Sequence, residues 1–267
     1  MTPPVNAPVL LRLPDATALR QMSDLRYGPV DGRGWGPSLR AAYGHHTPDD
    51  VYEALVAGIV VPGVAWLDVG CGRQAFPNNK ALAAALSSRC ARLVGVDPDA
   101  TLQENESVHE KVALRIDEYD GKQQFDVVTL RMVAEHVADP EAAVRSIERA
   151  LRKGGIAVVF TVFAYAPIPL LTRLAPMRLR HVVKDWLWGS DARDTFPTRF
   201  RMNTRGRLRR VFAGAGMHEE AFLRLDDCRT FARFRALCEL ELRVARLCRW
   251  VGLPYWEHCL LGVYRKP

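Results

Sequence analysis

This sequence of 267 residues lacks several features that would define its class at once. None of its six cysteines belongs to a C-x-x-C pair or has the spacing of a metal site, so we predict reduced thiols and no bound metal. No apolar run reaches the ~18 residues that a membrane-spanning helix needs. The first eight residues hold three prolines and no basic stretch before an apolar core, which is unlike a secretory signal. We therefore expect a cytoplasmic protein.

Composition and charge describe an ordinary globular protein with one unusual segment. Hydrophobic residues make up 48% and charged residues 25%, and the length suits one α/β domain with insertions. The net charge of +7 is local, because residues 173–210 hold ten arginines and one lysine against three aspartates, a balance of +8. The basic character therefore calls for a local explanation.

The most informative stretch is residues 66–72, which place a carboxylate and two glycines at the end of a predicted buried strand over 64–69. A helix over 78–87 is predicted to follow. Gly70 and Gly72 allow a turn and let a ligand lie against the backbone. Together with Ala75 they also fit a dinucleotide pattern, but the carboxylate of Asp68 would repel a pyrophosphate and suits an ammonium group.

A second carboxylate, Asp97, ends the next predicted strand, residues 92–96. From that position a carboxylate can accept hydrogen bonds from both hydroxyls of a ribose. A nucleoside that carries a positively charged amino acid satisfies both Asp68 and Asp97. S-adenosylmethionine is such a molecule.

At this point the chain resembles the class I S-adenosylmethionine-dependent methyltransferases, and in particular their small-molecule group with an Asp-x-Gly-Cys-Gly motif. The resemblance covers roughly residues 64–163 and rests on five motifs in the expected order. They are Asp68-Val69-Gly70-Cys71-Gly72, Leu93-Val94-Gly95-Val96-Asp97, Phe125-Asp126-Val127-Val128, Glu135-His136-Val137 with Asp139-Pro140, and Leu151-Arg152-Lys153-Gly154-Gly155.

The resemblance implies an α/β fold with a Rossmann-like, seven-stranded, mostly parallel sheet, helices on both faces and an antiparallel last strand. We expect an N-terminal arm and capping loop over residues 1–48, in which 26–37 form an ordered loop rather than a helix. The methyltransferase domain then takes residues 49–267, with a basic amphipathic insertion at 166–203.

The remaining elements are predicted from pattern and capping residues. They are a helix from Thr47 to about 60, a helix after Asp97-Pro98-Asp99, strands at 112–116, 125–130 and 156–163, a helix from Asp139 ended by Gly154-Gly155, a helix capped by Thr204, a strand at 218–225, a helix at 229–251 with an apolar core face, and a strand at 259–264.

The resemblance also assigns the cofactor residues. Asp68, Gly70 and Gly72 hold the methionine end, Asp97 with Pro98 holds the ribose, and Asp117 meets the adenine with the backbone of Glu118 beside it. Cys71 lies in the same cofactor-binding turn, with a packing role as its favoured alternative. An ordinary loop acid is the alternative for Asp117 and for Glu118. Arg131, at the end of the fourth strand, holds a carboxylate of the cofactor or of a substrate, with a surface ion pair as the alternative.

Three histidines are candidate general bases. His136 follows the fourth strand, and because neighbouring helical residues point about 100° apart, only one of Glu135 and His136 can face the cofactor. Histidine has a pKa suited to removing a proton from an acceptor. By resemblance, the helix after Thr47 brings His45 and His46 to the rim of the pocket. A structural role for His136 and solvated loop positions for the other two are the alternatives.

The insertion at 166–203 alternates apolar and basic residues and includes Trp186 and Trp188. Such a segment is typical of a surface that meets an anionic, apolar partner, so residues 166–210 are a candidate contact with an anionic membrane surface. A lid over a small-molecule or lipid-linked acceptor is the other main interpretation. Contact with nucleic acid is the least favoured.

The sequence therefore predicts in-line methyl transfer from S-adenosylmethionine, with S-adenosylhomocysteine as product, to a small-molecule or lipid-like acceptor. Three alternatives stay open: a nicotinamide-dependent oxidoreductase, which Asp68 disfavours, a non-catalytic S-adenosylmethionine-binding scaffold, and an RNA ribose methyltransferase that uses the arginine cluster. Methylation of base amino groups is disfavoured, because Leu130-Arg131-Met132-Val133 stands where an Asn/Asp-Pro-Pro-Tyr/Phe motif would lie.

Overall fold

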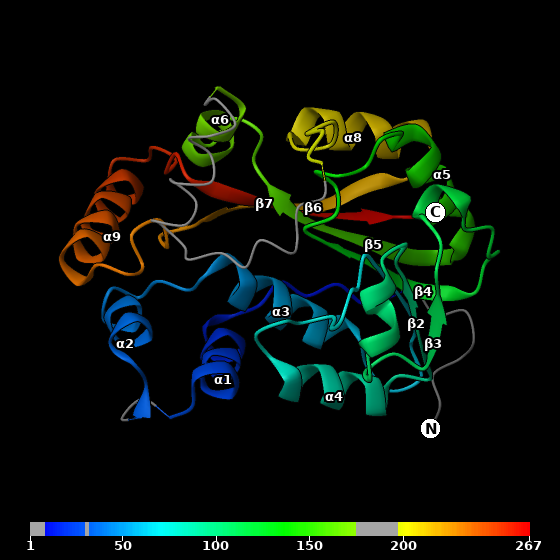
Figure 1. Cartoon of the computed structure of the whole chain (residues 1–267), viewed down its shortest axis with the longest axis horizontal. Coiled ribbons are helices and arrows are strands. Elements are labelled where there is room, and N and C mark those ends of the chain that lie inside the picture. The colour runs from blue at the N-terminus through cyan, green and yellow to red at the C-terminus, as the bar shows by residue number, and fades with distance from the viewer. Residues whose placement is uncertain (1–8, 30–31, 175–196) are drawn as a thin grey trace.

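The computed structural model describes residues 9–29, 32–174 and 197–267, and shows a central sheet with helices on both sides (Figure 1). Within these residues seven strands lie in the order β3-β2-β1-β4-β5-β7-β6. Their bounds are β1 Ala65–Val69, β2 Arg92–Val96, β3 Glu110–Val112, β4 Phe125–Arg131, β5 Leu151–Val162, β6 His218–Asp226 and β7 His258–Arg265. Strands β1 to β5 pair in parallel, whereas β7 is antiparallel to both β5 and β6. The predicted fold class is confirmed.

The strand order places a ligand crevice at the middle of the sheet. The chain moves from β1 outward to β2 and β3, and then returns to β4 on the other side of β1. In open α/β sheets ligands bind where the order reverses, beyond the carboxyl ends of the strands. Here those ends carry Val69, Val96 and Arg131.

Side chains alternate across the sheet and build two cores. Trp66 lies in the core under α3 (Pro48–Ile59) and α4 (Lys80–Arg89), where Tyr52 stacks on Phe160 with ring centroids 5.0 Å apart. Leu67 lies in the other core, under α5 (Pro140–Ala150) and α8 (Arg205–Gly214). Figure 1 shows the two helix layers on opposite sides of the sheet. Both faces of the parallel strands are thus covered, as such strands require.

Polar side chains fix where three helices begin. Thr47 and Asp50 form a reciprocal capping box at the start of α3. Asp139 accepts a hydrogen bond from Ala142 N at 2.9 Å before α5, and Thr204 accepts one from Arg207 N at 3.3 Å before α8. The predicted starts of these helices are confirmed.

The N-terminal region is more helical than predicted. The expected loop over 26–37 is wrong, because α1 (Ala16–Tyr27) and α2 (Trp35–Ala42) reach into it from both sides. Asp15 caps α1 by accepting from Thr17 N at 2.9 Å and Ala18 N at 2.8 Å. In α2 the glycine and the proline after Trp35 lie in the first turn, where a missing N–H costs no helical hydrogen bond.

The segment between β2 and β4 has little regular structure. Instead of an α-helix after Asp97-Pro98-Asp99 there is a short 3₁₀ helix, η2 (Ala100–Glu104), capped by Asp99. The strand predicted at 112–116 ends at Val112, and Ile116–Glu118 form a second 3₁₀ turn, η3. The pairing of β2 with β3 involves only three residues of β3, so this edge strand is short.

Gly154 and Gly155 do not end α5, contrary to the prediction. The helix ends at Ala150 and β5 begins at the next residue, Leu151. The two glycines lie inside β5, where the pairing with β4 shifts register between Phe125 and Val127. Gly154 has φ +76, and a Cβ on Gly155 would lie 3.0 Å from two backbone oxygens. The glycines therefore serve an irregularity in the strand.

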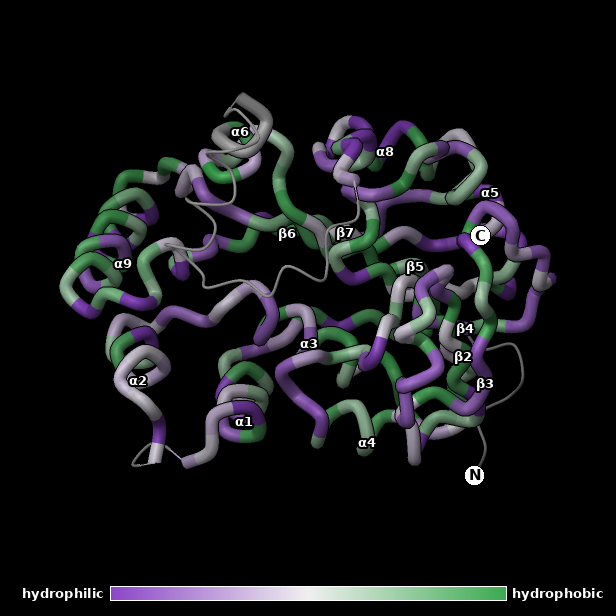
Figure 2. Tube along the Cα trace, viewed as in Figure 1, coloured by the Kyte–Doolittle hydropathy of each residue, from purple (hydrophilic) through white to green (hydrophobic). Residues whose placement is uncertain are grey.

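The apolar face predicted for the long C-terminal helix is only partly a core face. Helix α9 (Arg235–Trp250) buries Cys238, Leu242 and Ala245 in a small cluster with Cys228 and Tyr255. Other apolar residues stay exposed: Leu237 41%, Leu240 56%, Leu247 57% and Trp250 82%. Figure 2 shows hydrophobic and hydrophilic residues alternating along this peripheral helix. The small cluster therefore covers only part of the apolar surface of α9.

The basic insertion is described only at its ends. Residues 166–174 include α6 (Pro167–Leu174), whereas the predicted amphipathic stretch at 175–196, with Trp186 and Trp188, lies outside the described residues. After it, Arg205 pairs with Glu219 at 2.6 Å and Arg207 with Glu141 at 2.8 Å. Among the described helices, none is both long and apolar enough to cross a bilayer.

Candidate functional site

Two adjoining cavities lie at the predicted crevice. One, of about 610 Å³, is lined by the loop after β1 and by residues after β2 and β4. The other, of about 250 Å³, is lined by residues 114–117 and by the segment after β4. They share Gly70, Pro98, Val133 and His136. The carboxyl ends of β1, β2 and β4 therefore open onto one continuous crevice.

Asp68 presents an unsatisfied carboxylate oxygen in the larger cavity. The residue is 2% exposed, and its Oδ1 accepts a hydrogen bond from Thr129 Oγ1 at 2.6 Å. Thr129 in turn accepts from Trp66 Nε1 at 2.7 Å, which fixes its hydroxyl. Within the described chain Asp68 Oδ2 is buried without a partner, and burial raises the pKa of Asp68 to about 7. A buried oxygen of this kind calls for a donor, and an ammonium group fits it.

Asp97 holds the glycine loop after β1 through a hydrogen bond of its carboxylate. Its Oδ2 accepts from Gly72 N at 2.8 Å and its Oδ1 from Asp99 N at 2.8 Å. A carboxylate has about four acceptor positions, so these two bonds leave capacity for the two hydroxyls of a ribose. Asn105 adds a bond from its amide to Gly72 O at 3.0 Å. The loop is thus arranged by its own side chains.

The two glycines of the loop are required by its conformation. Gly70 has φ +69 and Gly72 has φ +43, a region that residues with a Cβ rarely adopt. A Cβ on Gly70 would lie 2.1 Å from Val133 Cγ2, whereas one on Gly72 would meet no atom closer than 3.9 Å. Val133, from the segment after β4, therefore lies directly over Gly70 and gives the loop an apolar cover.

Cys71 lines the larger cavity, and its thiol packs against β2. A Cβ on Gly95 of β2 would lie 2.6 Å from Cys71 Sγ, so the thiol occupies the space that this glycine leaves. Burial, together with Asp68 and Asp97, raises the pKa of the thiol well above its ordinary value. The prediction of a packing role is consistent with this geometry, and all six cysteines are free.

The smaller cavity has the character expected for a planar apolar ring. Val69, Val96, Leu114 and Ile116 line it together with Asp117. The Asp117 carboxylate is paired with Arg115 through contacts of 3.0 and 2.6 Å. Glu118 is not among the lining residues, and its carboxylate accepts from Arg115 N at 3.2 Å.

Arg131 lines the larger cavity but is neutralised there. Its Nη2 lies 2.6 Å from Asp49 Oδ1, and Asp49 Oδ2 lies 2.5 Å from Arg229 Nη1. Arg229 also pairs with Asp227 at 2.6 Å. The two arginines hold the pKa of Asp49 well below its ordinary value, although burial acts in the opposite direction. This chain of four charges ties the first turn of α3 to the end of β4.

Glu135 and His136 lie in a turn rather than in a helix, in which His136 N donates to Val133 O at 2.9 Å, and they face different surroundings. Glu135 is 6% exposed and accepts a hydrogen bond from Thr161 Oγ1 at 2.7 Å. Its backbone oxygen accepts from Arg199 N at 2.6 Å and from Phe200 N at 3.0 Å, which holds the chain after the insertion over the crevice. His136 lines both cavities, and its Nδ1 lies 3.4 Å from Pro197 O.

The structure does not bring His45 and His46 to the crevice. Both line a separate cavity between α1, α2 and the start of α3. The reason is the direction of the first turn of α3, where Asp49 faces Arg131 while Asp50 faces Arg26 on the other side. The predicted rim position is therefore corrected.

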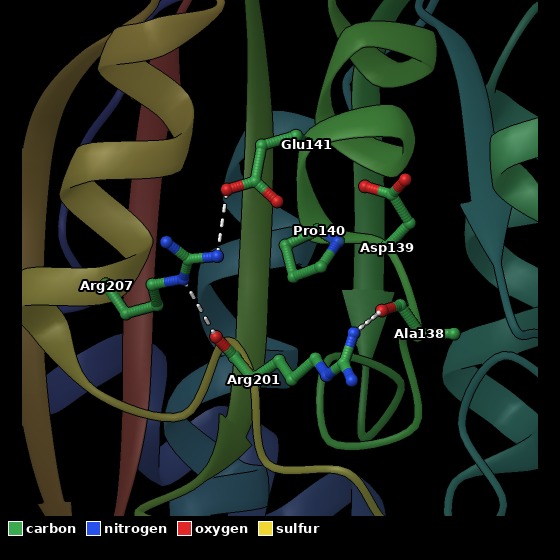
Figure 3. Close-up of a pocket in the computed structure, with 6 residues that line it drawn as sticks. All are labelled: Ala138, Asp139, Pro140, Glu141, Arg201 and Arg207. Atoms are coloured by element: carbon green, nitrogen blue, oxygen red, sulfur yellow. Dashed lines mark hydrogen bonds and ion pairs between the residues drawn. The ribbon is translucent and has the colours of Figure 1, made fainter.

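A further hollow, of about 550 Å³, lies between α5 and α8. Figure 3 shows that both arginines of this hollow have partners within it: Arg207 contacts Glu141 at 2.8 Å and Arg201 O at 3.3 Å, and Arg201 contacts Ala138 O at 2.6 Å. Because both arginines already have partners, we assign no chemistry to this hollow. The described residues hold no group of three or more His, Cys, Asp or Glu placed to bind a metal.

Sequence reasoning missed three residues that shape the crevice: Asp49, Thr129 and Val133. Asp49 was visible only as an acid in a first helical turn. Thr129 faces Asp68 because β1 and β4 pair in register at these two residues. No local signal reports such a cross-strand contact.

Comparisons with known proteins identify the family of this chain. The profile of a family described as a methyltransferase domain matches residues 42–218. The chain belongs to this family, and it is a class I S-adenosylmethionine-dependent methyltransferase.

Individual relatives and solved structures match this chain over part of its length or at low sequence identity. A ubiquinone biosynthesis O-methyltransferase from Bradyrhizobium sp. is 33% identical over 108 residues, which cover 38% of this chain and 40% of that protein. The chain thus spans about two fifths of the curated relatives that it matches. An S-adenosylmethionine-dependent methyltransferase from Mesorhizobium loti shares the fold, with a TM-score of 0.51, 20% identity and coverage of 89% of this chain and 100% of that one. The cyclase SpnF has a TM-score of 0.50 at 18% identity, covering 96% and 98%.

Proposed function

We propose that this chain methylates an oxygen of a small, largely apolar acceptor and that His136 is the general base. The observation that carries the proposal is the position of His136, which lies where the two cavities meet. His45 and His46 line another cavity. Among the described histidines, His136 alone lines the crevice at the ends of β1, β2 and β4.

The cofactor fits the crevice by the chemistry of its donors and acceptors. Asp68 offers a buried acceptor for an ammonium group, and Asp97 offers acceptor positions for the ribose. The apolar cavity beside Asp117 suits the adenine. S-adenosylmethionine, when bound, supplies an electrophilic methyl group. The protein then needs mainly to hold the acceptor in line with that group and to exclude water.

His136 would accept the proton that the acceptor hydroxyl loses. A proton on Nδ1 can be donated to Pro197 O, at 3.4 Å, and this tautomer makes Nε2 the basic nitrogen. Glu135, directly beside it, is held in the core by Thr161 and therefore fixes the backbone rather than taking part in the chemistry. His136 would be the catalytic residue and Glu135 a positioning residue.

Oxygen is proposed as the methylated atom because the curated relatives are named O-methyltransferases. In the larger cavity, Met132 and Val133 supply an apolar lining that suits an acceptor with an apolar ring or chain. The proposal extends to contact with an anionic membrane surface through residues 166–210, whose sequence is strongly basic. Co-sedimentation with vesicles of anionic and of neutral lipid tests this part.

The test of the base is the formation of S-adenosylhomocysteine from catechol-type acceptors by wild type, His136→Gln and His218→Gln. His218 is an exposed residue of β6 and serves as the control. Loss of a general base should lower kcat by about a hundredfold to ten-thousandfold and remove the acidic limb of the pH profile. The affinity for S-adenosylhomocysteine should stay unchanged. If His136→Gln keeps the wild-type kcat and pH profile, His136 is not the base.

A further inference from the structure

A third cavity, of about 400 Å³, lies between α1, α2 and the start of α3. It shares no lining residue with the cofactor crevice in the described parts of the chain. Its walls include three arginines, Arg20, Arg33 and Arg40, and two carboxylates, Asp24 and Asp50. The charge of the cavity depends on which of these groups are already paired.

Both carboxylates are neutralised by neighbouring arginines. Arg33 forms an ion pair with Asp24, and Arg26 lies 2.9 Å from Asp50. Asp50 also accepts a hydrogen bond from Thr47 N at 2.8 Å within the capping box. Neither acid is therefore available to compensate another positive charge in the cavity.

Arg40 is a buried cation without a counter-ion. The residue is 8% exposed, and no hydrogen bond or ion pair of its guanidinium exists within the described residues. Its guanidinium instead lies over the ring of Tyr27, whose centroid is 5.9 Å from Arg40 Cζ. A buried arginine ordinarily pairs with a carboxylate, since removing its charge from water is costly. Arg40 instead lines the cavity with Arg20, which bonds only the carbonyl of Ala16 at 3.2 Å.

The two histidines add no positive charge to the cavity, chiefly because burial disfavours the charged form of both imidazoles. The pKa of His45 is lowered to about 4 by burial and by the positive charges of Arg249 and Arg40, while Asp227 acts in the opposite direction. The pKa of His46 is lowered by burial and by Arg20 and Arg33, against an opposing effect of Asp50. Both imidazoles are therefore neutral, and the positive charge around them stays uncompensated.

We propose that this cavity binds an oxyanion, the phosphate or carboxylate group of a small molecule, through Arg40 and Arg20. A guanidinium binds two oxygens of such a group through a pair of parallel hydrogen bonds. The anion supplies the counter-charge that Arg40 lacks. The site is independent of methyl transfer, because it neither shares residues with the cofactor crevice nor requires the acceptor proposed above.

The test is a titration of the full chain with inorganic phosphate and, separately, with acetate, at constant ionic strength so that screening does not change. The Cε1–Hε1 resonance of His46, which lines the cavity, is followed by NMR, with His218 as an internal reference. We expect a saturable shift of His46, and of His45, which lines the same cavity, while His218 stays unchanged. Saturation by phosphate but not acetate identifies a phosphate site, and the reverse identifies a carboxylate site. Absence of saturation by either anion overturns the proposal.

Three arginine variants then locate the anion. Arg40→Gln should weaken binding about tenfold or more, because a charged hydrogen-bond partner is lost, and Arg20→Gln should weaken it less. Arg145→Gln removes the same charge from the exposed face of α5 and should leave binding unchanged. Wild-type affinity in a folded Arg40→Gln protein overturns the proposal. Should that variant not fold, Arg20→Gln decides: weaker binding supports the site and unchanged binding overturns it.

Discussion

The cofactor crevice and the N-terminal cavity are opposite in charge and in construction. In the crevice a buried acceptor, Asp68 Oδ2, lacks a donor, and burial raises the pKa of its carboxyl to about 7. In the N-terminal cavity Arg40, a largely buried donor, has no acceptor among the described residues, and burial lowers the pKa of the neighbouring His45 to about 4. The first site suits a cation and the second an anion. An unsatisfied buried group thus indicates both that a ligand is expected and which charge it carries.

The two sites also differ in what holds them. The crevice is built from backbone and short acids at strand ends, where Asp97 binds the amides of Gly72 and Asp99. The N-terminal cavity is built from long side chains that project from separate helices. If the two sites are independent, a variant in one should change ligand binding there and leave the other site unchanged. A variant that changes binding at both sites would contradict this independence.

The largest effect should come from Asp97→Ala. The variant removes the acceptor for the ribose and the anchor of the loop, so the affinity for S-adenosylhomocysteine should fall about a hundredfold or more. Methylthioadenosine, which keeps the ribose, should lose affinity to a similar extent. Calorimetric titration measures both, and the response of His46 to phosphate should stay intact. Near-normal binding of S-adenosylhomocysteine would show that Asp97 only supports the loop.

Gly70→Ala and Gly44→Ala compare the backbone of the crevice loop with that of the N-terminal cavity. Both glycines have positive φ, +69 and +61, so alanine is strained at either position. Alanine at 70 would in addition meet Val133 Cγ2 at 2.1 Å, whereas Gly44, which lines the N-terminal cavity, has nothing within 4 Å. Denaturant unfolding should show a loss of about 1–2 kcal/mol for Gly44→Ala from strain alone. Gly70→Ala should lose about 2–5 kcal/mol, and equal losses would contradict the close approach.

Asp68→Asn should separate two ligands that share the adenosine group. S-adenosylhomocysteine carries the ammonium that Asp68 would accept, and methylthioadenosine does not. The variant should weaken S-adenosylhomocysteine about tenfold to a hundredfold and leave methylthioadenosine nearly unchanged. Equal weakening of the two ligands, measured by the same titration, would place the ammonium elsewhere.

The smallest effect, compared over one pH unit, is a dependence of cofactor affinity on pH. The pKa of Asp68 is raised in the folded protein from 3.8 to about 7, so the folded chain binds more protons than the unfolded chain between these values. Stability from this group is therefore present at low pH and is lost as the pH rises toward 7. Ammonium binding needs the ionised form, so the affinity for S-adenosylhomocysteine should rise by at most about tenfold per pH unit up to neutrality. Asp68→Asn should abolish the slope, and a slope that persists would assign it to another group.

Much of the sheet could be predicted because its signals are local. The strands β1, β2 and β4 were placed within one residue, since each is an apolar run that ends at a polar residue or a glycine. The starts of α5 and α8 followed from Asp139 and Thr204, whose side chains cap the next residues of the chain. The fold class and the assignment of Asp68 and Asp97 to the crevice rest on such signals.

The features that could not be predicted depend on contacts between residues that are far apart in the sequence. Gly154 and Gly155 fit both a helix end and a strand irregularity, and only the pairing with β4 distinguishes them. Apolar spacing along α9 could not reveal that only a small cluster covers the helix. His45 and His46 follow the direction of α3, which the pairing of Asp49 with Arg131 and of Asp50 with Arg26 determines.

The double ion pair of Asp49 has a consequence for folding kinetics. Asp49 bonds Arg131 and Arg229, which are 82 and 180 residues away along the chain. Contacts of such separation require the closure of long loops and form after the local elements. We therefore expect Asp49→Asn to speed unfolding while leaving the folding rate almost unchanged, as rates measured across denaturant concentrations would show. The charges that position Arg131 at the crevice would thus prolong the lifetime of the folded state without guiding the chain toward it.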